Sequence, residues 1–121
     1  MPQSRLITVE LQFPPRMDAF HARMVLVKIV DISLADAPSI LIAQQKLENI
    51  LCATQSPLLL HIDLPAALTP SNWIAQAHIS RSGNEQYSAG DLITIQSYPV
   101  LKETQQLALQ LVTIYTITAW F

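Results

Sequence analysis

The residues of this chain that could carry out chemistry are few and scattered. Cys52 is the only cysteine, and His21, His61 and His78 are the histidines that could serve it as a base. A cysteine nucleophile needs such a base to form its reactive thiolate, but no sequence signature of a cysteine enzyme surrounds Cys52. We therefore expect a buried, unreactive thiol, with an intermolecular disulfide as the alternative.

The carboxylates also fall short of a catalytic or metal site. Asp31 and Asp36 lie close in sequence, but both belong to a turn, where such side chains bond to backbone amides. His61 and Asp63 are two residues apart in a strand-like run and therefore point the same way. Two ligands do not complete a metal site. The sequence predicts that the protein is not an enzyme and binds no metal or cofactor.

Composition narrows the class of protein further. Half of the 121 residues are apolar, only 13% are charged, and the formal net charge is -2. This length predicts a single domain spanning residues 1–121. The seven Lys and Arg are scattered along the chain, which argues against nucleic-acid binding. No run approaches the roughly 20 apolar residues of a membrane-spanning helix, so we expect the chain as given to be soluble.

Alternation of apolar and polar residues, the period of a β-strand, runs through most of the chain. Ile7, Val9 and Leu11 fall on one face of a strand that Pro14 ends. Trp73 falls on one face of another strand and is expected in the core. The predicted strands are 5–13, 24–31, 39–47, 58–64, 73–81, 85–88, 92–97 and 106–118.

The segments between these strands carry turn residues. Ser82, Gly83 and Asn84 predict a hairpin turn, and residues 66–72 predict a short helical turn. Tyr98-Pro99 predicts either a cis bond or the termination of a strand at a sheet edge. The fold class is therefore all-β: an antiparallel β-sandwich of seven or eight strands with at most one short helical turn.

The most distinctive stretch is MVLVKIVDISLADAPSILIAQQ, residues 24–45, in which two strand-like apolar runs flank a compact polar turn. Asp31 and Ser33 have short side chains that bond to nearby backbone amides, and Pro38 keeps the residue before it extended. The turn is interpreted as structural, with direct contact to a ligand as the alternative.

This stretch, together with Pro14-Pro15, SPLLLHIDLP, WIAQAHI and SYPVL, resembles the YbaY-like lipoprotein family. The family includes type III secretion pilotins of the YscW/ExsB type, and the resemblance covers residues 6–101. It implies a β-sandwich that binds the C-terminal segment of an outer-membrane secretin and, as a chaperone, assists its localisation and assembly. It also implies attachment to the periplasmic face of the outer membrane through an N-terminal lipid, in a full-length form carrying a signal and lipid-acceptor Cys that this sequence lacks.

Two other functions stay open from the sequence. One is a general periplasmic or outer-membrane lipoprotein with a structural or envelope role, and the other is a small sandwich that binds an apolar ligand between its sheets. A peptide partner would dock either as an added strand or as an amphipathic helix in a groove. Trp120 and Phe121 are the candidate partner contacts, with packing against the core as their alternative. We expect a monomer or weak dimer.

Overall fold

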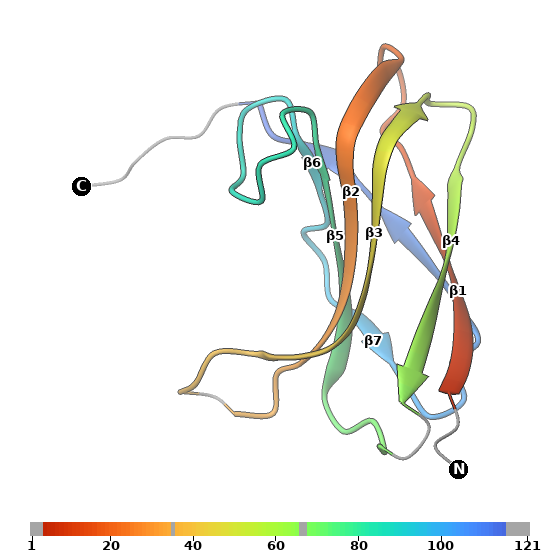
Figure 1. Ribbon diagram of the computed structural model, residues 1–121, viewed down its shortest axis with the longest axis vertical. Coiled ribbons are helices and arrows are strands. Elements are labelled where there is room, and N and C mark those ends of the chain that lie inside the picture. The colour runs from red at the N-terminus through yellow and green to blue at the C-terminus, as the bar shows by residue number, and fades with distance from the viewer. Residues whose placement is uncertain (1–3, 35, 66–67, 116–121) are drawn as a thin grey trace.

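The computed structural model describes residues 4–34, 36–65 and 68–115, which form two stacked β-sheets (Figure 1). The small sheet has the order β4-β1-β8, and the large sheet has the order β3-β2-β5-β6-β9, with β7 also paired to β5. The strands are β1 (Ser4–Gln12), β2 (Phe20–Asp31), β3 (Ile40–Cys52), β4 (Leu58–Pro65), β5 (Trp73–Ser80), β6 (Leu92–Ile93), β7 (Tyr98–Val100), β8 (Gln106–Gln110) and β9 (Val112–Thr113).

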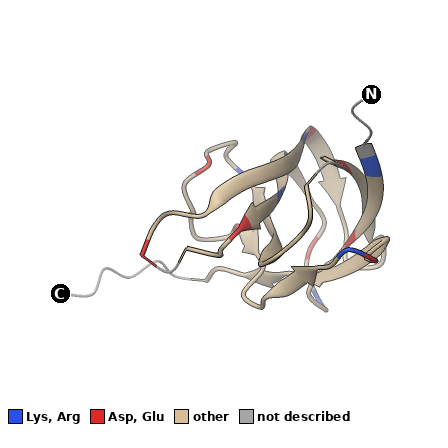
Figure 2. Ribbon diagram, turned by 90° about the horizontal axis from the view of Figure 1, so that it is seen from below, with Lys and Arg blue, Asp and Glu red and all other residues tan. Residues whose placement is uncertain are grey.

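This architecture confirms the predicted all-β sandwich. All strand pairs are antiparallel except β1 and β8, which run parallel. No helix occurs among the described residues, and so none there is long and apolar enough to cross a membrane. Lys and Arg appear in Figure 2 as separate blue segments rather than one stripe, as the sequence predicts.

The core lies between the sheets and follows the predicted alternation. Apolar residues of β1 and β4 face inward from the small sheet, and those of β2 and β5, Trp73 among them, face inward from the large sheet. Residues without solvent exposure include Ile7, Val9, Leu11, Val25, Val27, Ile29, Ala75, Ile79, Leu92, Leu109 and Leu111. Burial of this much apolar surface is the main stabilising contribution to the fold.

Two predicted strands are too short. β2 begins at Phe20 rather than at residue 24, and β3 continues to Cys52 rather than ending at 47, with Phe20 paired to Cys52. Alternation is lost at this end of β3 because Asn49 has a left-handed backbone, with a φ of 57°. A residue in that conformation turns its neighbours to other directions, so the sequence no longer reads as a strand.

Three further predictions need correction. Residues 85–88 form no strand, because residues 81–91 form a loop that is bonded to a buried carboxylate. Residues 68–72 contain no helical turn, and residues 66–67 lie outside the described part. The predicted strand 92–97 pairs with β5 only as far as Thr94, whose N–H donates to the Ala77 carbonyl at 3.2 Å. The chain then leaves the sheet and returns as β7.

The described part of the last predicted strand, 106–118, is divided between the two sheets, and residues 116–118 lie outside the described residues. β8 pairs with β1 and β9 pairs with β6, so the chain crosses from the small sheet to the large one near Leu111. The Tyr98 hydroxyl fixes this crossing by accepting a hydrogen bond from the Gln110 N–H at 3.0 Å. Pro99 pairs at the edge of β5, and no cis peptide bond occurs in the described ranges.

Candidate partner-binding surface

Two projections frame the face of the large sheet that is turned away from the small sheet, here called the outer face (Figure 1). One projection is the β2–β3 tip, residues 32–34 and 36–41, and the other is the β5–β6 loop, residues 81–91. In β2 and β5, every second side chain points into the core, and the side chains between them point to the outer face. These are Met24, Leu26, Lys28, Val30, Ile74, Gln76, His78 and Ser80.

A buried carboxylate holds the β5–β6 loop against the outer face. Asp91 is 1% exposed, and one of its oxygens lies 2.9 Å from Nε2 of His78, which is 5% exposed. The N–H groups of Ser88 and Arg81 donate to the two Asp91 oxygens at 3.1 and 3.2 Å. A buried carboxylate is tolerated when its oxygens are paired in this way. Asp91 therefore joins both ends of the loop to β5.

Arg81 gives the loop a second attachment. Its Nε donates to the Gly90 carbonyl at 2.8 Å, and its guanidinium lies 3.7 Å from the centre of the Phe20 ring. Gly90 has a φ of 92°, and a Cβ there would lie 3.4 Å from two atoms of the Arg81 side chain. The glycine is thus required by its backbone conformation, while the Arg81 side chain would lie at about van der Waals contact with a Cβ there.

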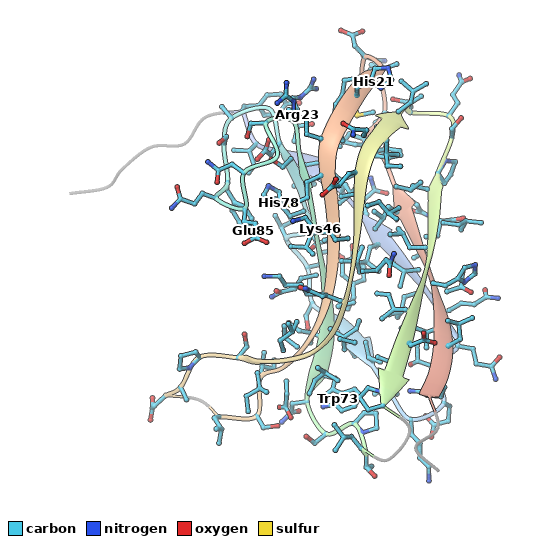
Figure 3. All side chains as sticks on the ribbon, viewed as in Figure 1. His21, Arg23, Lys46, Trp73, His78 and Glu85 are labelled. Atoms are coloured by element: carbon cyan, nitrogen blue, oxygen red, sulfur yellow. The ribbon has the colours of Figure 1, made fainter. Side chains whose placement is uncertain are left out.

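A hollow of about 230 Å³ lies between the β5–β6 loop and the outer face. The Tyr87 and His78 rings pack edge to face with centroids 4.7 Å apart, and Tyr87 is 54% exposed. Figure 3 shows His78 and Glu85 at this position. The hollow is lined by Leu26, Lys28, Gln76, Ala77, His78, Glu85 and Tyr87. It combines apolar side chains with charges of both signs.

The β2–β3 tip carries a cluster of exposed apolar side chains. Ile32 is 46% exposed, Leu34 59%, Ile40 53% and Leu41 50%. Single apolar residues at a surface need no explanation, but several on one projection are typical of an interaction site. The tip therefore supplies an apolar contact area at the opposite end of the outer face from the hollow.

Hydrogen bonds at the base of the tip confirm the predicted bond of Asp31 to a backbone amide, whereas the Ser33 hydroxyl bonds to other side chains instead of an amide. The Asp31 carboxylate accepts hydrogen bonds from the N–H and hydroxyl of Ser33, and the Ser33 hydroxyl lies 3.0 Å from that of Ser71. These bonds from Ser33, with a further one from Trp73, lower the pKa of Asp31 below its ordinary 3.8. The polar residues of the turn thus hold its base, while its apolar residues face solvent.

The other candidate residues of the sequence are spread over the molecule. Cys52 is fully buried, as predicted, and this burial raises the pKa of its thiol to about 11, which keeps it unreactive. His61 lies 3.3 Å from the Thr8 hydroxyl on the small sheet. Across the described ranges, no three potential ligands gather into a metal site. Trp120 and Phe121 lie outside the described residues.

The His78–Asp91 pair and the hollow were missed by the sequence reasoning. His78 falls on the outer face in the predicted alternation, and Asp91 belongs to a predicted turn. Only the path of the β5–β6 loop brings the two together. The one signal in the sequence was the Gly90-Asp91 pair, a glycine followed by a short polar residue at the end of the loop. In the structure this Gly90 has a positive φ.

Comparison with known proteins found a solved structure of similar fold. Neither a family model nor a curated protein matches the sequence. Among solved structures, the chain is similar to one described as an alternative pilotin from the type II secretion system of Vibrio cholerae. The match has a TM-score of 0.73 and 24% identity, and it covers 94% of this chain and all of the other. The protein thus has a pilotin-like β-sandwich fold.

Proposed function

We propose that this protein is a pilotin, which binds the C-terminal segment of an outer-membrane secretin and assists its localisation and assembly. The observation that carries the proposal is the likeness in fold to the alternative pilotin, which extends over nearly the whole of both chains. The type III assignment rests only on the resemblance of residues 6–101 noted from the sequence, since the similar solved structure belongs to a type II system. The proposed partner is a type III secretin, and a type II secretin is the competing partner.

The outer face of the large sheet is the proposed docking surface for the secretin segment. Its hollow provides the exposed Tyr87 ring beside the charged Lys28 and Glu85, with the buried Leu26 behind them. The β2–β3 tip adds exposed apolar side chains at the other end. An amphipathic segment laid between the two projections would cover both areas, so we favour docking in a groove over addition of a strand.

We further propose that the full-length protein works at the periplasmic face of the outer membrane, attached through an N-terminal lipid. This part of the proposal is supported by the sequence resemblance to lipidated pilotins. It is tested by expressing the full-length gene with its leader, fractionating the membranes and searching for the lipid by mass spectrometry. Recovery of an unlipidated protein from the periplasm alone would overturn this part.

The alternative of an apolar ligand held between the sheets is not favoured by the structure. Side chains of both sheets pack directly on one another there, with Leu11, Ile29, Ile62 and Ile79 almost entirely buried. A ligand would have to displace this core, at a cost of several kcal/mol in lost packing.

The direct test of the proposed function is binding of synthetic secretin segments to the full chain, measured by isothermal titration calorimetry. Segments from the C-termini of type III and type II secretins are compared with a scrambled sequence of the same composition. We expect saturable 1:1 binding to the type III segment only. Binding to the type II segment alone would reassign the secretion system, and binding to neither would overturn the pilotin proposal.

A further inference from the structure

β3 forms one edge of the large sheet and is paired on one side only. It is 13 residues long and bonds to β2, while its other side has no partner strand among the described residues. Among the described residues, β3 makes no backbone hydrogen bond besides those of its ladder with β2. A long open edge is a template for pairing with another strand.

The two charged residues of this edge lie on the same face. Lys46 pairs with Leu26 and Glu48 pairs with Met24, and both partners belong to the outer face. Lys46 and Glu48 are exposed, and within the described ranges neither forms an ion pair. Between them, Leu47 points to the other face and packs against the core.

We propose that β3 pairs with β3 of a second copy of this chain, antiparallel and about a twofold axis at Leu47. In that register, residues whose numbers sum to 94 lie opposite one another. Lys46 of each copy then faces Glu48 of the other, and the symmetry makes this contact twice. Opposite charges directly across an antiparallel pair are stabilising, and like charges are destabilising.

The same charges select this register over the neighbouring one. A shift of the axis to Lys46 would place the two Lys46 side chains opposite each other. Lysine at an edge ordinarily discourages pairing between strands. Here Glu48, two residues from Lys46, gives the lysine of the second copy an opposite charge to face. The ladder is short, because an extra residue near Ile42 and the left-handed Asn49 bend its ends. A weak dimer is therefore expected.

The test exchanges the two charges in the full chain and measures its mass by sedimentation velocity over a range of micromolar concentrations. Lys46→Glu alone and Glu48→Lys alone each place like charges opposite one another, and each should weaken the dimer about tenfold. Mixing the two variants restores both pairs, so an equimolar mixture should form a heterodimer. The double variant Lys46→Glu/Glu48→Lys should dimerise as the unchanged chain does.

Lys102→Glu, an equal charge change outside the large sheet, is the matched control and should leave the dimer unchanged. Misfolded variants could not form a heterodimer on mixing. The mixing experiment therefore separates a loss of the charge pairs from a loss of folding stability. A chain that stays monomeric at every concentration would overturn the proposal. So would single variants that lose secretin binding rather than self-association, because the edge would then be a peptide site. Failure here leaves the pilotin proposal standing, since secretin binding is assayed separately.

Discussion

The two projections that frame the outer face are built in opposite ways. The β5–β6 loop is held by a buried carboxylate with three nitrogen partners and by the Arg81 side chain. Among its described residues, the β2–β3 tip has one long turn bond, from the Ala37 N–H to the Leu34 carbonyl at 3.5 Å, and is otherwise bonded at its base. Its apolar residues lie in solvent.

This difference separates a region built for stability from one suited to binding. Buried polar groups that are fully paired fix a loop in one conformation. Exposed apolar groups contribute little to folding, but they become buried when a partner covers them. We therefore expect substitutions in the β5–β6 loop to change the free energy of unfolding, and substitutions at the tip to change affinity.

The largest expected effect on stability is that of Asp91→Ala. The change leaves His78 and the N–H groups of Ser88 and Arg81 without their acceptor in a buried site. It should lower the free energy of unfolding by about 3 kcal/mol, measured by urea denaturation. Asp36→Ala at the exposed tip should change it by less than about 0.5 kcal/mol. Equal effects of the two substitutions would remove the contrast between the projections.

Gly90→Ala should have an intermediate effect. Its φ of 92° strains any residue with a Cβ, and the new atom would meet Arg81 at 3.4 Å. We expect a loss of about 1 to 2 kcal/mol in the free energy of unfolding. Ala89→Ser, at the exposed neighbouring position, is the control and should be nearly neutral. An unchanged urea midpoint for Gly90→Ala would show that the loop is not held as described.

The smallest stability effect should come from Asp31 at the base of the tip. Bonding to Ser33 lowers its pKa below 3.8 in the folded state, so Asp31 stabilises the fold above the unfolded pKa. That contribution is lost as the pH falls through the lowered folded pKa. The protein should be slightly more stable than its Asp31→Asn variant near neutral pH, and this gap should close in acid. Thermal unfolding at several pH values tests it; a gap that widens in acid would contradict the assignment.

Much of the fold was predictable because alternation alone assigns faces. Trp73 and Ile79 faced the core as their period required. The predictions failed where contacts between residues far apart in the sequence determine the path of the chain. The sequence predicts that Gln110 and Val112 belong to one continuous strand. In the structure, the Tyr98 hydroxyl accepts a hydrogen bond from the Gln110 N–H at the point where the chain passes from one sheet to the other. The hollow depends on Tyr87 folding back over His78, and no local pattern encodes that contact.

The tip was only half predicted from the sequence. Asp31 and Ser33 were identified as turn-forming residues. The structure confirms the bond of Asp31 to a backbone amide, but the Ser33 hydroxyl bonds to side chains instead. The exposure of Ile40 and Leu41 was not foreseen, because apolar residues at the start of a strand read as core. They are exposed because the tip bends away from the small sheet, leaving no layer to cover them (Figure 1).

The most direct test of the account is to map binding of the type III secretin segment with matched substitutions on opposite sides of the sandwich. Leu34→Ser and Leu41→Ser alter the tip, while Leu6→Ser and Leu59→Ser alter the small sheet at similar exposure, 56% and 58%. We predict that each tip variant binds about tenfold more weakly by calorimetry. The small-sheet variants should bind as the unchanged chain does, and all four should keep its unfolding midpoint. Unaltered binding by the tip variants, or an equal loss in the small-sheet variants, would contradict the assignment of the outer face as the docking surface.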